Sequence, residues 1–284
     1  MTPATHGRVA IVTGGGSGIG AALSRALIAR GDTVIVADID GASAEHVADE
    51  LSAGELGERA TAAKVDVRDA VAVQGLVDDT VAAHGRLDLI FNNAGIAIGG
   101  DDLELTVAHW DRIIDINLRG VVNGVQAAYP VMARQRSGSI VNTASVAGLI
   151  PVPFLAPYVA VKHAVVGMSI SLRGEAKAHN VNVTVVCPGF TDTPMLDSTG
   201  PDDLPKPTML REGGAREAAE RLGKVYPVDK LAADILRGVD RRKAFVVAPR
   251  QARAMWRVNR FMPGPFAAIV GFGARREQKK LSAG

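Results

Sequence analysis

The chain has 284 residues, of which 47% are hydrophobic and one is a cysteine. This composition allows one large core, excludes an internal disulfide and a multi-cysteine metal site, and contains no apolar run near the roughly 20 residues of a membrane-spanning helix. The formal net charge of +2 is uneven, because residues 241–284 hold eleven basic residues and one acid while residues 1–240 carry −8. An acidic body with a basic end argues against a nucleic-acid-binding protein.

Short apolar runs rich in Val, Ile and Ala alternate along the chain with longer amphipathic patterns. Strands are predicted at 8–13, 33–38, 62–67, 87–92, 138–145, 181–188 and 244–249, and helices at 18–30, 41–52, 69–84, 103–135, 157–179 and 227–239. The strands are nearly continuous in apolar residues, as expected when both faces are buried. The pattern predicts an α/β fold: a single-domain, Rossmann-type, doubly wound parallel sheet of about seven strands with helices on both faces.

Two segments interrupt the alternation of strands and helices. Residues 190–226 are rich in Pro, Gly and charge, and a connection of this length is typical of a lid over a substrate site. Residues 250–284 follow the last strand and form a basic C-terminal extension. The predicted organisation is therefore a catalytic domain over 1–249, including the insertion 190–226, followed by the extension.

A glycine-rich turn joins the first predicted strand to the first predicted helix. Glycine suits a tight turn that must approach a pyrophosphate closely, and a helix N-terminus offers free N–H groups to phosphates. On its own such a turn is weak evidence, but its position between a strand and a helix favours dinucleotide binding. The candidate cofactor-binding residues here are Gly14, Gly16, Ser17, Gly18, Ile19 and Gly20.

Asp38 ends the second predicted strand, about 20 residues after the glycines. An acid at this position accepts hydrogen bonds from the ribose hydroxyls of NAD and repels the 2′-phosphate of NADP. Asp38 and its neighbour Ile39 are therefore candidate cofactor contacts, and NAD is the predicted cofactor. The alternative is that Asp38 only caps the following turn.

Taken together, these and later motifs resemble the short-chain dehydrogenase/reductase family over residues 7–249. The carrying motifs are Thr13-Gly14-x-x-x-Gly18-x-Gly20, Asn92-Asn93-Ala94-Gly95, Asn117, Ser145, Tyr158-x-x-x-Lys162 and Cys187-Pro188-Gly189. The resemblance implies a catalytic set of Asn117, Ser145, Tyr158 and Lys162. It implies further cofactor contacts at Asp66, Val67, Asn93, Ala94, Gly95, Tyr158, Lys162, Pro188, Gly189, Phe190, Thr191 and Thr193.

The residues of this set also make chemical sense by themselves. Tyr158 and Lys162 are four residues apart, so they share one face of a helix. A phenol has an ordinary pKa of about 10, and a nearby ammonium and the positive nicotinamide would lower it. Tyr158 would then act as general base or acid while Ser145 positions the substrate oxygen. In the family, the residue matching Asn117 helps to hold a water in the proton relay.

The residues predicted to face the substrate are mostly apolar. They are Ile96, Phe154 and Met195, together with Ser145 and Tyr158. This set predicts a small hydrophobic alcohol or ketone as substrate, although the apolar side chains could equally serve loop packing. The six histidines are scattered without metal-ligand spacing, so no metal is expected. The N-terminus lacks the apolar region of a signal peptide, which favours a cytoplasmic location.

The extension pairs arginines at three- and four-residue spacing with Met, Trp, Val and Phe, which predicts a basic amphipathic helix that stops at residues 262–266. Three interpretations stay open: a cover for the cleft or a subunit interface, a peripheral contact with an anionic membrane, or a solvated end. The family resemblance implies a homodimer or homotetramer through the helices at 103–135 and 157–179.

The leading functional hypothesis is hydride transfer between NAD(H) and a hydrophobic secondary alcohol or ketone, with a tyrosine as general acid or base. One alternative is a reductase of carrier-bound 3-oxoacyl groups, which usually uses NADPH and is therefore disfavoured by Asp38. Another is a catalytically idle NAD-binding sensor or scaffold. The complete set of Asn117, Ser145, Tyr158 and Lys162 argues against the idle protein, because a sensor need not retain the base.

Overall fold

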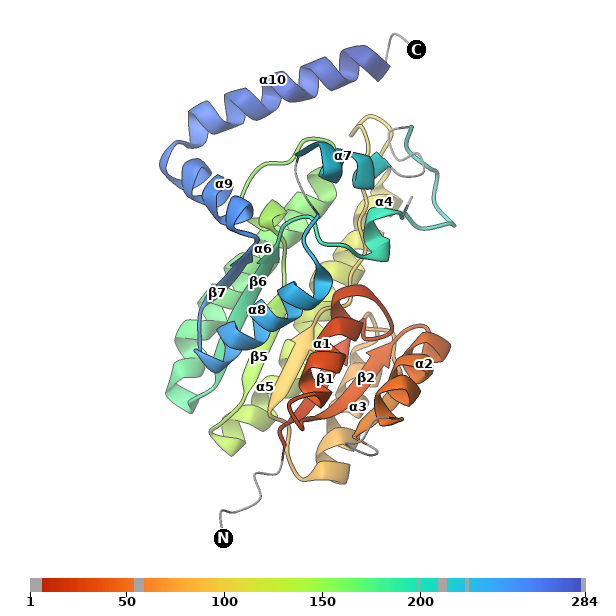
Figure 1. The fold of residues 1–284 in the computed structure, drawn as a ribbon, viewed down its shortest axis with the longest axis vertical. Coiled ribbons are helices and arrows are strands. Elements are labelled where there is room, and N and C mark those ends of the chain that lie inside the picture. The colour runs from red at the N-terminus through yellow and green to blue at the C-terminus, as the bar shows by residue number, and fades with distance from the viewer. Residues whose placement is uncertain (1–6, 54–58, 199, 209–213, 223–224, 282–284) are drawn as a thin grey trace.

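The computed structural model describes residues 7–53, 59–198, 200–208, 214–222 and 225–281. Its centre is one parallel sheet of seven strands in the order β3-β2-β1-β4-β5-β6-β7 (Figure 1). The strands are β1 (Val9–Thr13), β2 (Thr33–Asp38), β3 (Ala60–Lys64), β4 (Leu89–Asn92), β5 (Ser139–Thr143), β6 (Asn182–Pro188) and β7 (Phe245–Ala248). The predicted doubly wound α/β fold is confirmed.

Helices cover both faces of the sheet and divide the core into two layers (Figure 1). On one face lie α1 (Gly18–Ile28), α2 (Gly41–Ser52) and α8 (Val228–Asp240), and on the other lie α3 (Ala70–His84), α5 (Gly120–Gln135) and α6 (Ala156–Ala176). Successive residues of a strand point to opposite faces; in β1, Ile11 packs into one layer while Ala10 and Val12 pack into the other. This two-sided burial explains why the strands read as continuous apolar runs.

The chain reverses direction across the sheet between β1 and β4, which are direct neighbours. Connections from β1 run toward β2 and β3, whereas those from β4 run toward β5, β6 and β7. Such a switch point leaves a crevice beyond the carboxyl ends of the two strands, where ligands of open α/β sheets bind. The glycine turn follows β1 at this point, and Asn93 follows β4.

The third predicted strand and the fourth predicted helix differ most from the structure. The third strand pairs over 60–64 instead of 62–67, because β3 is an edge strand whose pairing with β2 ends at Asp38 and Lys64. The predicted helix at 103–135 is divided into α4 (Val107–Ile114), a π-helical segment η1 (Asp115–Arg119) and α5. At its start, Thr106 forms a capping box with His109, so the helix begins four residues later than its apolar pattern suggested.

The insertion 190–226 contains the 3₁₀ segment η4 (Pro194–Leu196) and helix α7 (Gly214–Leu222). Its two ends are joined by a bridge between Thr191 and Tyr226. The Tyr226 N–H donates to the Phe190 carbonyl at 2.9 Å, and the Asp192 N–H donates to the Tyr226 carbonyl at 3.0 Å. Hydrogen bonds therefore join the two ends of the insertion, one just after β6 and the other just before α8.

The C-terminal extension forms two helices, α9 (Arg250–Phe261) and α10 (Pro263–Leu281). Proline at the first position of a helix lacks only an N–H that would have no partner there, so Pro263 ends α9 and also begins α10. The sequence-based prediction of a stop after the arginine-rich helix was right, but it missed the second helix. Within the described residues, no helix is both long enough and apolar enough to cross a membrane.

Candidate active site at the carboxyl edge of the sheet

The glycine turn between β1 and α1 is built without room for side chains. Gly14 and Gly18 have positive φ angles of 63° and 49°, a backbone region that favours glycine. A Cβ on Gly20 would lie 1.9 Å from the Gly14 carbonyl oxygen, and one on Gly16 would lie 2.8 Å from the Cβ of Ser43. The Ser17 side chain makes no capping hydrogen bond. The first N–H groups of α1, where Ile19 lies, are therefore directed at the crevice.

The Asp38 carboxylate lies directly beside this turn. One of its oxygens accepts the Gly16 N–H at 3.0 Å, and the other accepts the Asp40 N–H at 3.1 Å. Capping of α2 is performed by Asp40, whose side chain accepts the N–H groups of Ala42 and Ser43. Asp38 therefore does cap the turn that follows β2, as the alternative interpretation held, while the cap of α2 itself belongs to Asp40. The adjacent Ile39 is 57% exposed, which leaves an apolar face at the same rim.

The segment after β4 is fixed to the glycine turn by Thr13. The Thr13 hydroxyl donates to the Phe91 carbonyl and accepts the N–H groups of Asn93 at 2.9 Å and Ala94 at 3.1 Å. The Asn93 amide in turn donates to the Thr13 carbonyl at 3.1 Å. A Cβ on Gly14 would lie 2.8 Å from Ala94, so the two segments pack backbone against backbone.

On the opposite side of the switch point, α6 places Tyr158 and Lys162 on one face. The Lys162 ammonium lies 5.5 Å from the centre of the Tyr158 ring and donates to the Thr143 carbonyl at 2.9 Å. The Ser145 hydroxyl, just beyond β5, interacts with the Tyr158 phenol and donates to the Pro188 carbonyl at 3.4 Å. The phenol, the ammonium and the serine hydroxyl therefore converge, as the sequence predicted.

Burial shifts both titratable groups toward their neutral forms, because a charged group loses water on entering a low-dielectric site. It lowers the pKa of Lys162 to about 8. It also raises the pKa of the Tyr158 phenol, against the smaller lowering effect of the Ser145 hydrogen bond. In the protein alone, desolvation by burial is the largest effect. The pKa of the phenol is therefore raised, and not lowered as predicted from the nearby ammonium. The neighbouring Cys187 thiol is fully buried with a pKa raised to about 12, so it is a neutral core group.

The π-helical segment η1 presents Asn117 to the loop after β4. π-Helical turns are rare and often occur at functional sites. The fully buried Asn117 amide donates to the Ile96 carbonyl and accepts the Ile96 N–H, both at 2.8 Å. A Cβ on Gly95 would lie 3.1 Å from the Asn117 side-chain oxygen and 3.7 Å from the Lys162 ammonium nitrogen. Asn117 thus holds the loop that passes Lys162.

The predicted adenine-side pair lies after β3. The Asp66 carboxylate accepts hydrogen bonds from the backbone N–H and the guanidinium of Arg68, which lower the pKa of Asp66. The Val67 carbonyl accepts the Asn123 amide at 2.8 Å. Asn123 on α5 therefore fixes this rim, although no sequence motif marked it.

The segment after β6 lies beside the glycine turn. Gly189 donates to the Ala248 carbonyl at 2.7 Å, and the buried Thr191 donates to the Gly189 carbonyl at 3.1 Å. Thr193 lies 3.2 Å from the point that a Cβ on Gly18 would occupy. The predicted residues at 188–193 are thereby brought against the start of α1.

The predicted substrate-facing residues occupy different environments. Ile96 packs with the Tyr158 ring against a small apolar cluster that includes Ile98. Phe154 lies in the loop before α6 with a positive φ of 63°, a strained conformation for a bulky residue. Met195 in η4 is 37% exposed, and the nearby Phe190 is 39% exposed. Of the three apolar candidates, the described contacts place Ile96 in the same cluster as the Tyr158 ring.

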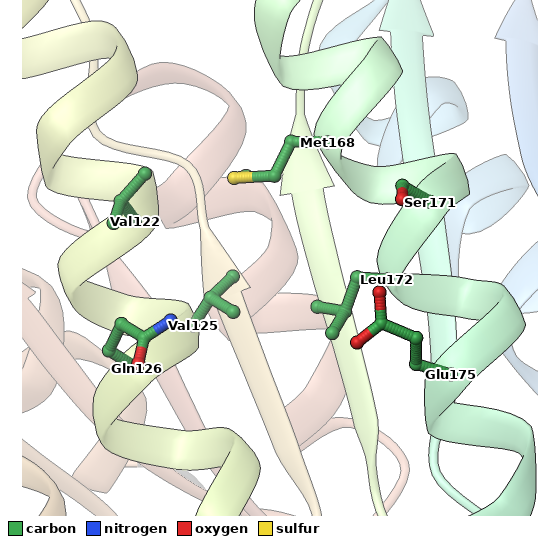
Figure 2. Close-up of a pocket in the computed structure, with 7 residues that line it drawn as sticks. All are labelled: Val122, Val125, Gln126, Met168, Ser171, Leu172 and Glu175. Carbon is green, nitrogen blue, oxygen red and sulfur yellow. The ribbon is translucent and has the colours of Figure 1, made fainter.

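A separate cavity of about 260 Å³ lies between α5 and α6 (Figure 2). Val125, Met168 and Leu172 point toward the space between the two helices, and Glu175 lies at one end. None of its lining residues belongs to the predicted site. This cavity is therefore a feature of the outer helical face and not of the crevice at the sheet edge.

Sequence reasoning missed several residues that hold the site together. Thr143 accepts Lys162 through its carbonyl and donates its hydroxyl to Asn93 at 3.3 Å. Asn142 donates to the Ser169 hydroxyl at 3.0 Å and thereby ties β5 to α6. The polar letters in the otherwise apolar run 138–145 were the available signal, since buried polar groups need partners.

The model of the short chain dehydrogenase family matches residues 8–204. The chain belongs to the short-chain dehydrogenase family. The family resemblance seen in the motifs is confirmed.

Individual relatives agree with this membership. The chain is 36% identical to the oxidoreductase UcpA of Salmonella typhimurium over 80% of this chain and 86% of that protein. It is also 36% identical to a cyclohexanol dehydrogenase of Acinetobacter, over 69% of this chain and 78% of that protein. The chain is 36% identical to the 3-oxoacyl-(acyl-carrier-protein) reductase FabG of Thermotoga maritima, over 68% of this chain and 77% of that protein.

A solved short-chain dehydrogenase from Burkholderia phymatum, in complex with NAD, superposes on this structure with a TM-score of 0.78. Its sequence is 30% identical, and the match covers 89% of this chain and 93% of that chain. The likeness therefore extends over the sheet and its covering helices.

Proposed function

We propose that this short-chain dehydrogenase transfers a hydride between NAD(H) and a hydrophobic secondary alcohol or ketone. The observation that carries the proposal is the convergence of the Tyr158 phenol, the Lys162 ammonium and the Ser145 hydroxyl at the carboxyl edge of the sheet. The glycine turn after β1 lies at the same edge, and only β4 separates β1 from β5, the strand that precedes Ser145. A site with an acid–base group, an orienting hydroxyl and a phosphate cradle fits dinucleotide-linked redox chemistry.

The turn after β1 fits a dinucleotide because its backbone is open where a pyrophosphate would approach. A Cβ on Gly16 would meet Ser43 and one on Gly18 would approach Thr193, so this close-packed turn requires glycine. The free N–H groups at the start of α1 would hold the phosphates, and the residues at 93–95 and 188–193 would flank the nicotinamide. When bound, NAD supplies the acceptor for the hydride.

The residues of the chain manage the proton. In oxidation, the Tyr158 oxygen accepts the proton of the substrate hydroxyl while Ser145 donates a hydrogen bond to the substrate oxygen and orients it. In reduction, the same phenol returns the proton to the carbonyl oxygen. The Lys162 ammonium favours the phenolate whenever both are charged, and its bond to the Thr143 carbonyl holds it in place.

The choice of NAD over NADP rests on Asp38. Its carboxylate is held beside Gly16 by two backbone N–H groups, and a negative group there repels a 2′-phosphate. The presence of NAD in the Burkholderia structure supports this assignment. A preference for NAD argues against the second candidate function, which is reduction of carrier-bound 3-oxoacyl groups with NADPH. The similarity to FabG is the reason to include this candidate in the test.

The substrate class rests on the apolar surroundings of the phenol. Ile96 packs against the same apolar cluster as Tyr158, and Phe190 and Met195 are partly exposed near the same edge. A relative named as a cyclohexanol dehydrogenase supports a compact, uncharged secondary alcohol.

The deciding experiment is NADH fluorescence with a panel of cyclic and linear secondary alcohols and ketones, each assayed with NAD(H) and NADP(H). We expect turnover with at least one apolar member and a kcat/KM for NAD at least tenfold above that for NADP. Asp38→Ala should narrow this ratio while Asp40→Ala, the matched control, should leave it nearly unchanged. A preference of the wild type for NADP, or turnover only with 3-oxoacyl thioesters, would contradict the proposal.

We also propose that copies of the chain associate into a homodimer or homotetramer through α5 and α6. The support is the cavity between them, whose lining includes the half-buried Val122, Met168 and Leu172. Leu172→Glu should lower the mass measured by light scattering, whereas Val71→Glu on α3 should leave it unchanged.

A further inference from the structure

The surface formed by α9 and α10 is unusually apolar for the outside of a protein. The described part of the chain has twelve large apolar side chains that are exposed, and six of them lie on these two helices. They are Met255, Val258, Phe261, Met262, Ile269 and Phe272, with exposed fractions from 43% to 80%. Scattered exposed apolar residues need no explanation, but a concentration of this kind marks an interaction surface.

The inner faces of the same helices are already occupied. On α9, Ala252 is buried, and the Trp256 ring packs on Phe245 with 5.1 Å between the ring centres. On α10, Phe266 and Val270 are half-buried, and Gln278 donates to Asp101 at 3.1 Å. The exposed apolar side chains therefore belong to faces that point away from the body.

Basic residues border this apolar surface on both sides. Arg250, Arg253, Arg257 and Arg260 are exposed on α9, and Arg275 and Arg276 are exposed near the end of α10. The guanidinium of Arg276 lies 4.6 Å from the centre of the Phe272 ring. Between Arg260 and Arg275 the sequence has fourteen uncharged residues. An apolar face flanked by cations of one sign is the pattern of helices that lie on anionic bilayers.

The length of the uncharged segment fits a helix in the membrane plane. Of its residues, 263–274 are helical in α10 and extend about 18 Å, short of the roughly 30 Å of a hydrocarbon core. Figure 1 shows α10 at one end of the molecule, where α7 and α9 also lie. The acidic body behind this end, with a net charge of −8 over residues 1–240, would be repelled by the same anionic surface and so kept away from it.

A second copy of the chain fits this surface less well. A two-fold symmetric contact places the same patch of both subunits together. Here it would bring two sets of arginines with the same charge into apposition, which is unfavourable. We propose that α9 and α10 dock this protein on an anionic phospholipid surface, with Ile269 and Phe272 inserted among the lipids and the arginines at the headgroups. This inference does not depend on the proposed reaction.

The test is co-sedimentation of the full-length protein with vesicles of phosphatidylcholine alone or with 30% phosphatidylglycerol. We expect at least tenfold stronger binding to the anionic vesicles, weakened by 0.5 M salt. Ile269→Ser with Phe272→Ser should reduce the binding at least tenfold. Arg275→Gln with Arg276→Gln should reduce it more than tenfold, because each basic residue near the surface contributes roughly a fivefold factor.

Matched controls use residues of the same exposure at other sites. Val71→Ser removes an apolar side chain that is 81% exposed on α3, and Arg241→Gln with Lys243→Gln removes two charges before β7. Both should bind within twofold of the wild type. Equal binding to the two vesicle types, or an equal loss in the controls, would overturn the proposal. So would a fall in oligomer mass on Ile269→Ser with Phe272→Ser while vesicle binding is unchanged, because the face would then join copies of the chain.

Discussion

The glycine turn after β1 and two later parts of the chain, the insertion and the C-terminal extension, are built in opposite ways. Around the glycine turn, backbone packs on backbone, so that a Cβ on Gly20 would meet the Gly14 oxygen at 1.9 Å. In the insertion, exposed ion pairs such as Arg216 with Asp192 and Asp197 make the contacts. On α10, Gly264, Gly271 and Gly273 have open space where a Cβ would be. The glycine turn tolerates few sequences and the two later parts tolerate many.

The largest effect should come from removing the phenol oxygen. Tyr158→Phe should lower kcat by about 10³-fold or more, since a positioned acid–base group contributes about 10² to 10⁴. NADH binding, followed by its fluorescence, should change less than threefold, because the ring still packs against the apolar cluster that includes Ile98. Retained turnover would assign the proton transfer to another group.

The packing contrast can be tested directly with two glycines. Gly20→Ala should destabilise the fold by about 3 kcal/mol or more, because the new Cβ overlaps a backbone oxygen that cannot move aside. Gly271→Ala on α10 has room and should stabilise its helix by up to about 1 kcal/mol. Urea unfolding of both variants measures the difference, and equal effects would break the comparison.

Lys162 gives the site a pH-dependent stability. Its pKa in the folded protein, about 8 against an ordinary 10.5, means that the unfolded chain binds more protons between these values. The free energy of unfolding should therefore rise with pH across this window. Lys162→Met should stabilise the protein by about 3 kcal/mol at pH 7, with the gain shrinking toward pH 10. A gain that is independent of pH would show that packing, not charge, is responsible.

The pH dependence of catalysis follows from the phenol. Because burial raises the pKa of Tyr158, alcohol oxidation should accelerate as the pH rises above neutrality, whereas ketone reduction should change little there, since it uses the protonated phenol. Initial rates in both directions between pH 6 and 10 provide the measurement. A parallel rise in both directions would contradict the assignment.

The smallest effect is expected in the insertion. Arg216 is an exposed side chain that bonds both Asp192 and Asp197. Exposed ion pairs contribute little to stability, so Arg216→Gln should leave the unfolding midpoint nearly unchanged and raise the KM for substrate more than that for NAD. A large loss of stability would place the insertion with the tightly packed region.

The sequence predicted most accurately what is buried or backbone-constrained. Seven apolar runs became the seven strands, and Tyr158 and Lys162 met because helical spacing places residues four apart on one face. What it could not supply were contacts between distant segments. The hydrogen bonds from Asn123 to the Val67 carbonyl and from Lys162 to the Thr143 carbonyl depend on how helices and strands cross. The break at η1 was also hidden, because π-helical turns are rare single turns within α-helices and this one covers only five residues.

The pairing of Thr191 with Tyr226 closes the insertion into a loop whose two stems are fixed at one point of the sheet. Because these stems bond to each other, we expect that the stretch after Thr193 can be exchanged for that of a relative without moving the strands beside it. Substrate preference would then change through one contiguous stretch of the gene, whereas the predicted proton-transfer and cofactor-binding residues lie outside it.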